Sequence, residues 1–358
     1  MRKIYILFFI LFFHLNSFTT EIKYEIVVSD LEVPWAFVFL PDNSMLITER
    51  KGELIHFKNG EKNIIKNLPK IISKNQGGLL DIELHPNFKE NGWIYIAYCS
   101  SNDNNDGINT SIMRFQIENL RAVKKELIYK ALPNSKRSIH FGSRIIFDRE
   151  NYLFFSIGDR GNRDLNPQDI TRDGGKIYRL HDDGRIPVDN PFVDETKSKK
   201  GIYSFGHRNP QGMVYDKENN KIWIHEHGPR GGDEINIIKA GENYGWPLAS
   251  YGINYIGTKF TDKKSISGMQ DPIHYWVPSI APSGMIMVKD SKYKSLNNSL
   301  LIGSLKFQYL HQCKIENNRV IEEKKLLTDI GRVRSIETDG QNNIYIGVEN
   351  LGILKLIH

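Results

Sequence analysis

The amino-acid sequence predicts an all-β protein, a six-bladed β-propeller made of four-stranded antiparallel sheets. Six segments share one strand–turn–strand pattern, and no convincing amphipathic helix interrupts them. Their starts are roughly 40 to 70 residues apart, which leaves room for one four-stranded blade and its insertions in each unit. A large sandwich of several hairpins is the alternative architecture.

Each repeated segment consists of an apolar strand, a turn containing Asp, Asn or Pro, and a second apolar strand that closes on a polar loop. Alternating apolar positions rich in β-branched and aromatic residues, bounded by turn residues, are typical of strand hairpins. The six segments are WAFVFLPDNSMLITER from Trp35, LLDIELHPNFKENGWIYIAY from Leu79, RIIFDRENYLFFSIGDRG from Arg144, GMVYDKENNKIWIHEHG from Gly212, GMIMVKDSKYKSLNNSLLIGSLK from Gly284 and VRSIETDGQNNIYIGVEN from Val333.

A propeller closes its ring when the last sheet is tied to the first strand of the chain. The strand YEIVV, at Tyr24–Val28, is available to complete the blade that ends in GILKLI. We therefore expect the two ends of the domain to pair.

Composition indicates a large globular core rather than disorder, with 358 residues of which 40% are hydrophobic and 11% aromatic. The formal charge of +6 comes from 48 basic and 42 acidic residues, with no long basic run. Such a mixed surface does not favour nucleic acid as a partner.

The first residues, MRKIYILFFILFFHL, place Arg2 and Lys3 before an apolar run from Ile4 to Phe13. This pattern is typical of a secretory signal and is too short to span a bilayer. We expect residues 1–20 to form the signal and residues 21–358 a single propeller domain, periplasmic or secreted and without stable membrane insertion. An uncleaved anchor is the alternative.

The only two cysteines are Cys99 and Cys313, too few for a disulfide scaffold. Two buried free thiols are expected, although the sequence leaves their pairing open.

Two loops, GHRNPQG (Gly206–Gly212) and EHGPRGGDE (Glu226–Glu234), concentrate Gly, Pro, Arg, His and acidic residues. Gly and Pro shape the backbone, so such loops can aim carbonyls and amides at a ligand. These loops contain no thiolate or His-x-x-His cluster, which disfavours zinc there. Carbonyls together with Asp233 and Glu234 are hard oxygen donors, which favour calcium.

Corresponding strand ends of a propeller gather at one mouth of the central channel, so residues far apart in the sequence are expected to converge there. His140 and Asp159 would form a general base and the carboxylate that orients it and makes it more basic. A structural imidazole and a turn-forming aspartate are the alternatives.

Four cations, Arg208, Lys306, Arg332 and Arg334, come from three blades. The Arg-x-Arg spacing points both guanidinium groups to one side of a strand. Converging guanidinium groups would suit a small polyanion, because they bind carboxylates in a bidentate manner. A surface charge stripe is the alternative.

Motifs for other chemistries are missing. The Gly pairs in the sequence do not follow a strand and open a helix, which disfavours nucleotide cofactors. There is also no GxSxG elbow, which disfavours an ordinary serine hydrolase.

The motifs HPNF, HFGSR, GDRG, GHRNPQG, HGPRGGDEIN, NYGWP and GINY occur in this order, and in this the chain resembles the soluble quinoprotein sugar dehydrogenases, in particular the aldose sugar dehydrogenase branch. The resemblance runs from Val33 to Gly340. It implies a six-bladed propeller that binds pyrroloquinoline quinone (PQQ), a planar tricarboxylate, over the channel mouth with Ca²⁺ beside it.

The resemblance also implies roles for particular residues. His140 would be the base, held by Asp159, and Arg208 would stabilise developing negative charge. The carbonyls of Gly228 and Pro229 would hold the cofactor's calcium, and Glu234 with the carbonyl of Tyr244 would hold a structural calcium. The positions that would contact the cofactor are Gln76, Arg208, Asn209, Tyr255, Ser304, Leu305, Lys306, Arg332, Val333 and Arg334. The segment FQYLHQC, Phe307–Cys313, departs from the family pattern through its aromatic residues.

The implied activity is the oxidation of aldose sugars at C1 to lactones, with hydride transfer to the quinone. A monomer acting on a small-molecule sugar is expected, while the preferred sugar and the electron acceptor are left open. A calcium-dependent propeller lactonase or hydrolase, or a non-catalytic sugar-binding propeller, are the alternatives.

Overall fold

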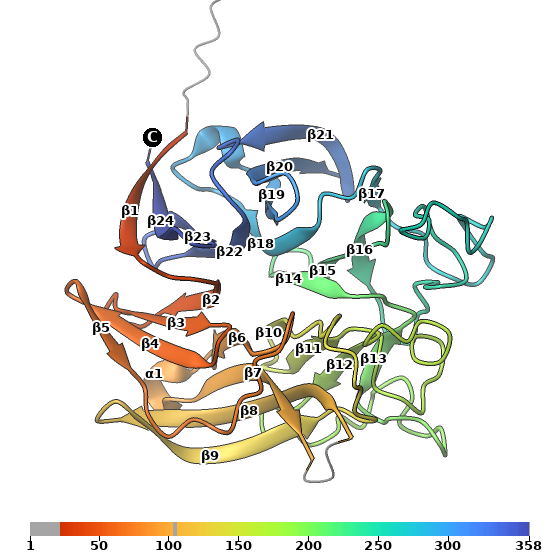
Figure 1. The fold of residues 1–358 in the computed structure, drawn as a ribbon, viewed down its shortest axis with the longest axis horizontal. Coiled ribbons are helices and arrows are strands. Elements are labelled where there is room, and N and C mark those ends of the chain that lie inside the picture. The colour runs from red at the N-terminus through yellow and green to blue at the C-terminus, as the bar shows by residue number, and fades with distance from the viewer. Residues whose placement is uncertain (1–21, 103–105, 358) are drawn as a thin grey trace, which may run out of the picture.

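Six four-stranded antiparallel sheets surround a central axis in the computed structural model, which describes residues 22–102 and 106–357 (Figure 1). The predicted six-bladed all-β propeller is therefore confirmed. The predicted signal segment, residues 1–20, lies outside the described residues.

The blades follow one another along the chain. Blade 1 contains β2 (Pro34–Phe39), β3 (Met45–Glu49), β4 (Glu53–Lys58) and β5 (Glu61–Ile64). Blade 2 contains β6 (Leu79–Leu84), β7 (Ile94–Ser101), β8 (Ile108–Glu118) and β9 (Arg121–Lys130). Blade 3 contains β10 (Ile145–Phe147), β11 (Leu153–Ile157), β12 (Lys176–Leu180) and β13 (Ile202–Phe205). Blades 4 and 5 contain β14 (Pro210–Asp216), β15 (Lys221–Glu226), β16 (Asp233–Ile238) and β17 (His274–Trp276), then β18 (Pro282–Val288), β19 (Ser299–Ser304), β20 (Tyr309–Glu316) and β21 (Arg319–Leu326). Blade 6 contains β22 (Val333–Thr338), β23 (Ile344–Val348), β24 (Gly352–Ile357) and β1 (Lys23–Ser29).

Blade 6 closes the ring by combining both ends of the described chain (Figure 1). Strand β1 pairs antiparallel with β24, from Lys23 opposite Ile357 to Ser29 opposite Gly352. The predicted pairing of the two ends is confirmed. Each of the six repeated sequence segments forms the first two strands of one blade.

Helical structure within the described residues is limited to α1 (Phe88–Asn91) and a 3₁₀ turn, η1 (Lys294–Leu296). Neither has the length and apolar character needed to cross a membrane.

Apolar side chains pack within and between the blades to form the core, which includes Ile96, Phe155 and Leu301, all fully buried. Cys99 on β7 and Cys313 on β20 are both buried and free, as expected. They belong to different blades and fill space in the core.

The first strands of the six blades line the central channel, and the side chain of Arg144 crosses it. Its guanidinium group donates to Asp81 Oδ1 at 2.8 Å and to the Gln211 carbonyl at 2.7 Å, and it lies 4.1 Å from the ring centre of Trp35. Trp35 and Gln211 line a cavity at one mouth, whereas Asp81 lines the channel on the other side. Arg144 therefore forms part of the floor between the two spaces.

Candidate active site

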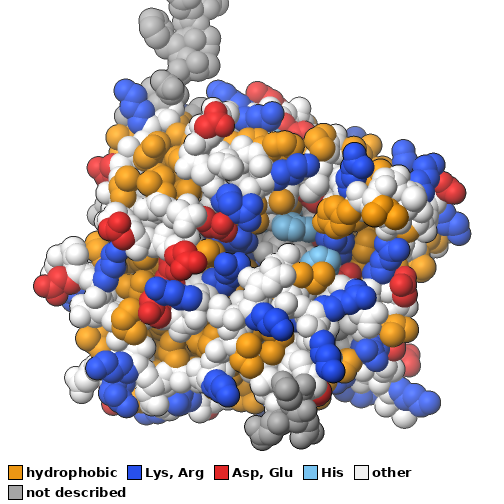
Figure 2. All heavy atoms as spheres, viewed as in Figure 1, with side chains coloured by type: hydrophobic (Ala, Val, Ile, Leu, Met, Phe, Trp, Pro, Cys, Tyr) orange, Lys and Arg blue, Asp and Glu red, His pale blue; other side chains and the backbone are white. Residues whose placement is uncertain are grey.

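A cavity of about 830 Å³ opens at one mouth of the channel, and every blade contributes to its lining. Figure 2 shows a central hollow with Lys and Arg side chains around it and His side chains in its wall. Predicted site residues that line it are Gln76, Asn209, Pro229, Tyr255, Leu305, Lys306, Arg332 and Arg334. Closure of the propeller thus brings together residues separated by more than 250 positions in the sequence.

His140 and Asp159 form a hydrogen-bonded pair. Neither lines the cavity, but the lining residue Phe141 directly follows His140 in the chain. Nδ1 of His140 lies 2.7 Å from Oδ1 of Asp159. The carboxylate also accepts hydrogen bonds from the Gly161 amide at 2.7 Å and from Nε1 of Trp246 at 2.9 Å. These three donors hold Asp159 in one orientation, so it can in turn orient the imidazole.

The environment of His140 lowers its pKa below the ordinary value of 6.5. Burial and the neighbouring Arg208 charge favour the neutral ring, and they outweigh the opposing effect of Asp159. The expectation that an acidic neighbour makes this histidine more basic is therefore wrong for the net effect, because the sequence does not reveal burial. A neutral ring at neutral pH is nevertheless the form that can accept a proton.

Arg208 is buried behind the cavity surface, and hydrogen bonds from its backbone amide and its side chain hold it in place. Its amide donates to Glu226 Oε2 at 2.5 Å, and its Nη1 donates to the His227 carbonyl at 3.0 Å. The guanidinium group also lies 5.3 Å from the ring centre of Trp246. Its charge therefore acts from within the wall.

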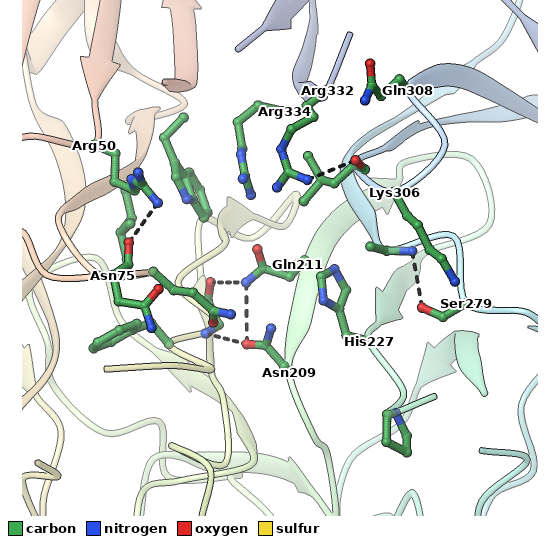
Figure 3. A pocket seen from close by; sticks show the side chains of 18 of the residues that line it. Arg50, Asn75, Asn209, Gln211, His227, Ser279, Lys306, Gln308, Arg332 and Arg334 are labelled. Carbon is green, nitrogen blue, oxygen red and sulfur yellow. Dashed lines mark hydrogen bonds between the residues drawn. The ribbon is translucent and has the colours of Figure 1, made fainter. Parts of the chain in front are cut away.

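The predicted Arg332 and Arg334 pair does point to one side, but a carboxylate bridges it. Nε of Arg332 donates to one oxygen of Glu349 at 2.6 Å, and Nε of Arg334 donates to the other at 2.9 Å. Sequence reasoning missed Glu349, which partly neutralises the two cations. The carboxylate also orients both guanidinium groups in the cavity, which the exposed Lys306 lines as well (Figure 3).

Ser304 and Val333 lie behind the cavity lining. The Ser304 hydroxyl donates to the Ile280 carbonyl at 2.9 Å, and Val333 is a fully buried core residue whose carbonyl accepts a hydrogen bond from Ser283. Ser304 ends β19 just before the turn that carries Lys306, and Val333 begins β22, the strand that carries Arg334.

The loop that contains Gly228 and Pro229 is tightly packed and rigidly held. A Cβ atom on Gly228 would lie only 2.3 Å from the Gly231 carbonyl oxygen and 2.2 Å from that of Gly232. Asp233 does not present a free carboxylate, because Oδ1 accepts from the Gly228 amide and Oδ2 from Ser279 and Ala281. Asp233 therefore shapes the loop whose carbonyls could bind a cation, and its own role as an oxygen donor remains a prediction.

Glu234 lies in an electronegative environment on β16. It pairs across the sheet with Glu226 on β15. Burial raises the pKa of Glu234 well above its ordinary value, and the charges of Glu226, Asp233 and Asp271 add to that effect. Next to it, Asn236 has a buried Oδ1 without a hydrogen-bond partner among the described residues. These oxygen atoms fit a hard divalent cation, which would offset the repulsion.

Tyr244, the other residue expected at this site, stacks on His207 with ring centres 4.7 Å apart. His207 in turn binds Glu226 through Nδ1 at 2.9 Å. The predicted residues Glu234 and Tyr244 thus belong to one connected region around Glu226.

Several lining residues were missed from the sequence, including Arg50, Gln211 and His227 (Figure 3). Arg50 follows the second strand of the first repeated segment, so the rule that strand ends gather at one mouth would have found it. Gln211 and His227 stand within the two unusual loops. Nε2 of His227 lies 2.6 Å from the Pro282 carbonyl oxygen, and burial lowers its pKa to about 3, so this ring is neutral.

Known proteins resemble this chain in amino-acid sequence. The family model described as Glucose / Sorbosone dehydrogenase matches residues 31–355. The chain is 38% identical to aldose sugar dehydrogenase YliI of Escherichia coli over 332 residues, which cover 91% of this chain and 89% of that protein. It is 33% identical to quinoprotein glucose dehydrogenase B of Acinetobacter calcoaceticus over 279 residues, covering 68% of this chain and 57% of that protein.

Solved structures of aldose sugar dehydrogenases also resemble the fold of this chain. The apo-form of the soluble aldose sugar dehydrogenase from Escherichia coli superposes with a TM-score of 0.90 at 36% identity, covering 94% of this chain and 99% of that one. The PQQ-bound form of an aldose sugar dehydrogenase from Streptomyces coelicolor gives a TM-score of 0.79 at 25% identity, with 94% and 97% covered.

Proposed function

Because the chain belongs to the Glucose / Sorbosone dehydrogenase family, we propose that it is a PQQ-dependent aldose sugar dehydrogenase that oxidises sugars at C1 to lactones. The observation that carries the proposal is a cationic, amide-rich cavity at the channel mouth, with the His140–Asp159 pair next to its lining residue Phe141.

The cavity lining supports a planar polyanion as the ligand. Arg50, Lys306, Arg332 and Arg334 line the cavity. One carboxylate, that of Glu349, pairs with Arg332 and Arg334, so positive charge is left in excess for the carboxylate groups of a ligand. The side-chain amides of Asn75, Gln76, Asn209, Gln211 and Gln308 add hydrogen-bonding groups. A volume of about 830 Å³ is sufficient for a cofactor together with a small sugar.

Calcium beside the cofactor would bind to the carbonyls of Gly228 and Pro229, which belong to the loop held by Asp233. The chemistry that bound PQQ and Ca²⁺ would supply is acceptance of a hydride from C1 of the sugar. A second calcium at Glu234 would have a structural role.

His140 would act as the general base. Since Nδ1–H donates to Asp159, Nε2 carries the lone pair, and this atom would accept the proton of the anomeric hydroxyl group. The lowered pKa keeps the ring neutral and ready for that step. Asp159 stabilises the resulting imidazolium, and the fixed charge of Arg208 in the wall stabilises negative charge that develops in the cavity.

The proposal is tested by adding PQQ and Ca²⁺ to the purified apoprotein. We expect one equivalent of bound quinone whose absorption spectrum is bleached by aldose, together with dye-linked sugar oxidation. A lactonase or hydrolase would cleave its substrate without the quinone, and a sugar-binding propeller would bind sugar without bleaching. Failure to bind PQQ in the presence of Ca²⁺ would refute the proposal.

Export of the chain and a monomeric state remain predictions from the sequence. They do not affect the chemistry proposed for the cavity.

A further inference from the structure

A second cluster of metal-binding side chains lies between blades 4 and 5, apart from the cavity lining. It contains His274 on β17, His311 and Cys313 on β20, and Glu323 on β21. One nitrogen of His311, the thiol of Cys313 and a carboxylate oxygen of Glu323 lie within 4.8 Å of one another. Nε2 of His274 is 3.2 Å from Glu323 Oε1.

Strand pairing explains why these residues meet. Cys313 and Glu323 stand directly opposite each other in the β20–β21 ladder, and cross-strand partners project from the same face. His311 is two residues before Cys313, so it shares that face. The ring of Trp276, the neighbour of His274 on β17, lies 5.8 Å from that of His311, which shows that β17 of blade 4 packs against this face.

One nitrogen atom of the cluster that could bind a metal is buried and makes no hydrogen bond to the described residues. His311 is only 4% exposed, and its Nε2 lies 2.6 Å from Glu323 Oε2, while its Nδ1 has no hydrogen-bond partner among the described residues. A buried polar atom without a partner is costly in free energy. Cys313 is fully buried as a free thiol. Neither residue lines the cavity proposed for the cofactor.

We propose that His311, Cys313, Glu323 and His274 form a binding site for Zn²⁺. Two imidazoles, one thiolate and one carboxylate are donors that zinc accepts in a four-coordinate site, and thiolate distinguishes this site from the oxygen-rich calcium sites. Tetrahedral ligands around zinc are about 3.5 Å apart. The ligand atoms of His311, Cys313 and Glu323 already lie within 4.8 Å of one another, and His274 reaches this group through its 3.2 Å contact with Glu323 Oε1. Binding displaces the proton of the Cys313 thiol and forms a zinc–sulfur bond.

The site has an access path, because the Glu323 side chain is 34% exposed and that of His274 is 20% exposed. Bound zinc would join the outer strand of blade 4 to the two outer strands of blade 5. The strand β20 begins directly after the turn that carries Lys306, so the ion would also brace that turn. This inference does not depend on the proposed sugar oxidation.

The test uses the full chain, freed of metal by a chelator and resupplied with excess Ca²⁺ so that the oxygen-rich sites are filled. Titration with Zn²⁺ should show one equivalent bound, and Co²⁺ in its place should give a thiolate-to-cobalt charge-transfer band. Cys313→Ser should abolish that band and weaken Zn²⁺ binding by about 10- to 100-fold or more. Cys99→Ser, which alters the other buried free thiol, should change neither.

Two further variants keep the test decisive if Cys313→Ser does not fold. Glu323→Gln and His274→Gln should each weaken Zn²⁺ binding while leaving the thiol in place. Absence of a stoichiometric Zn²⁺ equivalent, or a cobalt band that persists in folded Cys313→Ser, would overturn the proposal. In that case the cluster is a hydrogen-bonded network around Glu323.

Discussion

The Nδ1 atom of His140 lies 2.7 Å from Oδ1 of Asp159, a residue that is 1% exposed and that also binds Gly161 and Trp246. The two side chains come from loops on either side of the β10–β11 hairpin. This pairing makes the role of the histidine testable separately from cofactor binding.

His140→Asn should retain quinone binding but lose turnover. A positioned general base contributes about two to four orders of magnitude in rate, so dye-linked aldose oxidation should fall by that factor while the PQQ titration stays unchanged. His181→Asn, outside the cavity lining, serves as the control. Near-normal turnover by a folded, quinone-loaded His140→Asn variant would rule out the base.

Asp159→Asn should shift the pH dependence of kcat/KM. In the native protein Asp159 raises the pKa of His140 against the larger lowering effect of burial. Removing the negative charge lowers the pKa of His140 further, so the acid limb of the profile should move to lower pH. The rate loss should be smaller than for His140→Asn, and an unmoved acid limb would contradict the assignment.

Compared with the wild type, Glu234→Gln should have a higher melting temperature without calcium and a lower one with calcium. Because the folded-state pKa of Glu234 is raised above 4.5, the folded state binds its proton more tightly than the unfolded state. Without Ca²⁺, its ionisation therefore costs stability as the pH rises from 4.5 through the folded-state pKa. At neutral pH the variant should then melt at a higher temperature than the wild type.

Added Ca²⁺ should reverse that order, since an ion bound only to the folded state contributes about 2.7 kcal/mol when its free concentration is 100 times Kd. Thermal melts of both proteins with calcium and with chelator measure the effect. Equal calcium responses in the two proteins would remove Glu234 from the metal site.

Lys306→Ala should weaken binding of the quinone. One lost charge-assisted contact corresponds to about 1.5–3 kcal/mol, which a fluorescence or activity titration with PQQ can measure. Lys221→Ala provides a control, because Lys221 lies at the hairpin turn of β14 and β15, away from the cavity lining. An unchanged quinone titration would show that Lys306 does not contact the cofactor.

Gly228→Ala should impair the calcium that supports quinone binding. The added Cβ would lie within 2.3 Å of two carbonyl oxygens, so the loop must shift and its own carbonyls move with it. We expect a higher Ca²⁺ concentration to be needed for half-maximal activity. Gly340→Ala, where nothing lies within 4 Å of the new Cβ, should behave as the wild type.

The six blades could be predicted because the signal for each hairpin is local. Alternation of apolar residues and the turn residues between two strands are properties of about 20 neighbouring positions. The same rule, applied to every strand end, would have placed Arg50 at the same channel mouth as Lys306. Residue types alone therefore indicate a cationic site with a candidate base.

Charge balance and protonation depend instead on contacts between distant residues. Glu349 reaches Arg332 and Arg334 only because β22 and β23 pair, and the pKa of His140 falls because closure of the ring buries it beside Arg208. In the proposed zinc cluster, His311, Cys313 and Glu323 meet because β20 and β21 pair within blade 5, and His274 joins them from β17 of blade 4. Local pattern determines the strands, whereas burial and the distances between blades determine which side chains carry charge and which can share a metal ion.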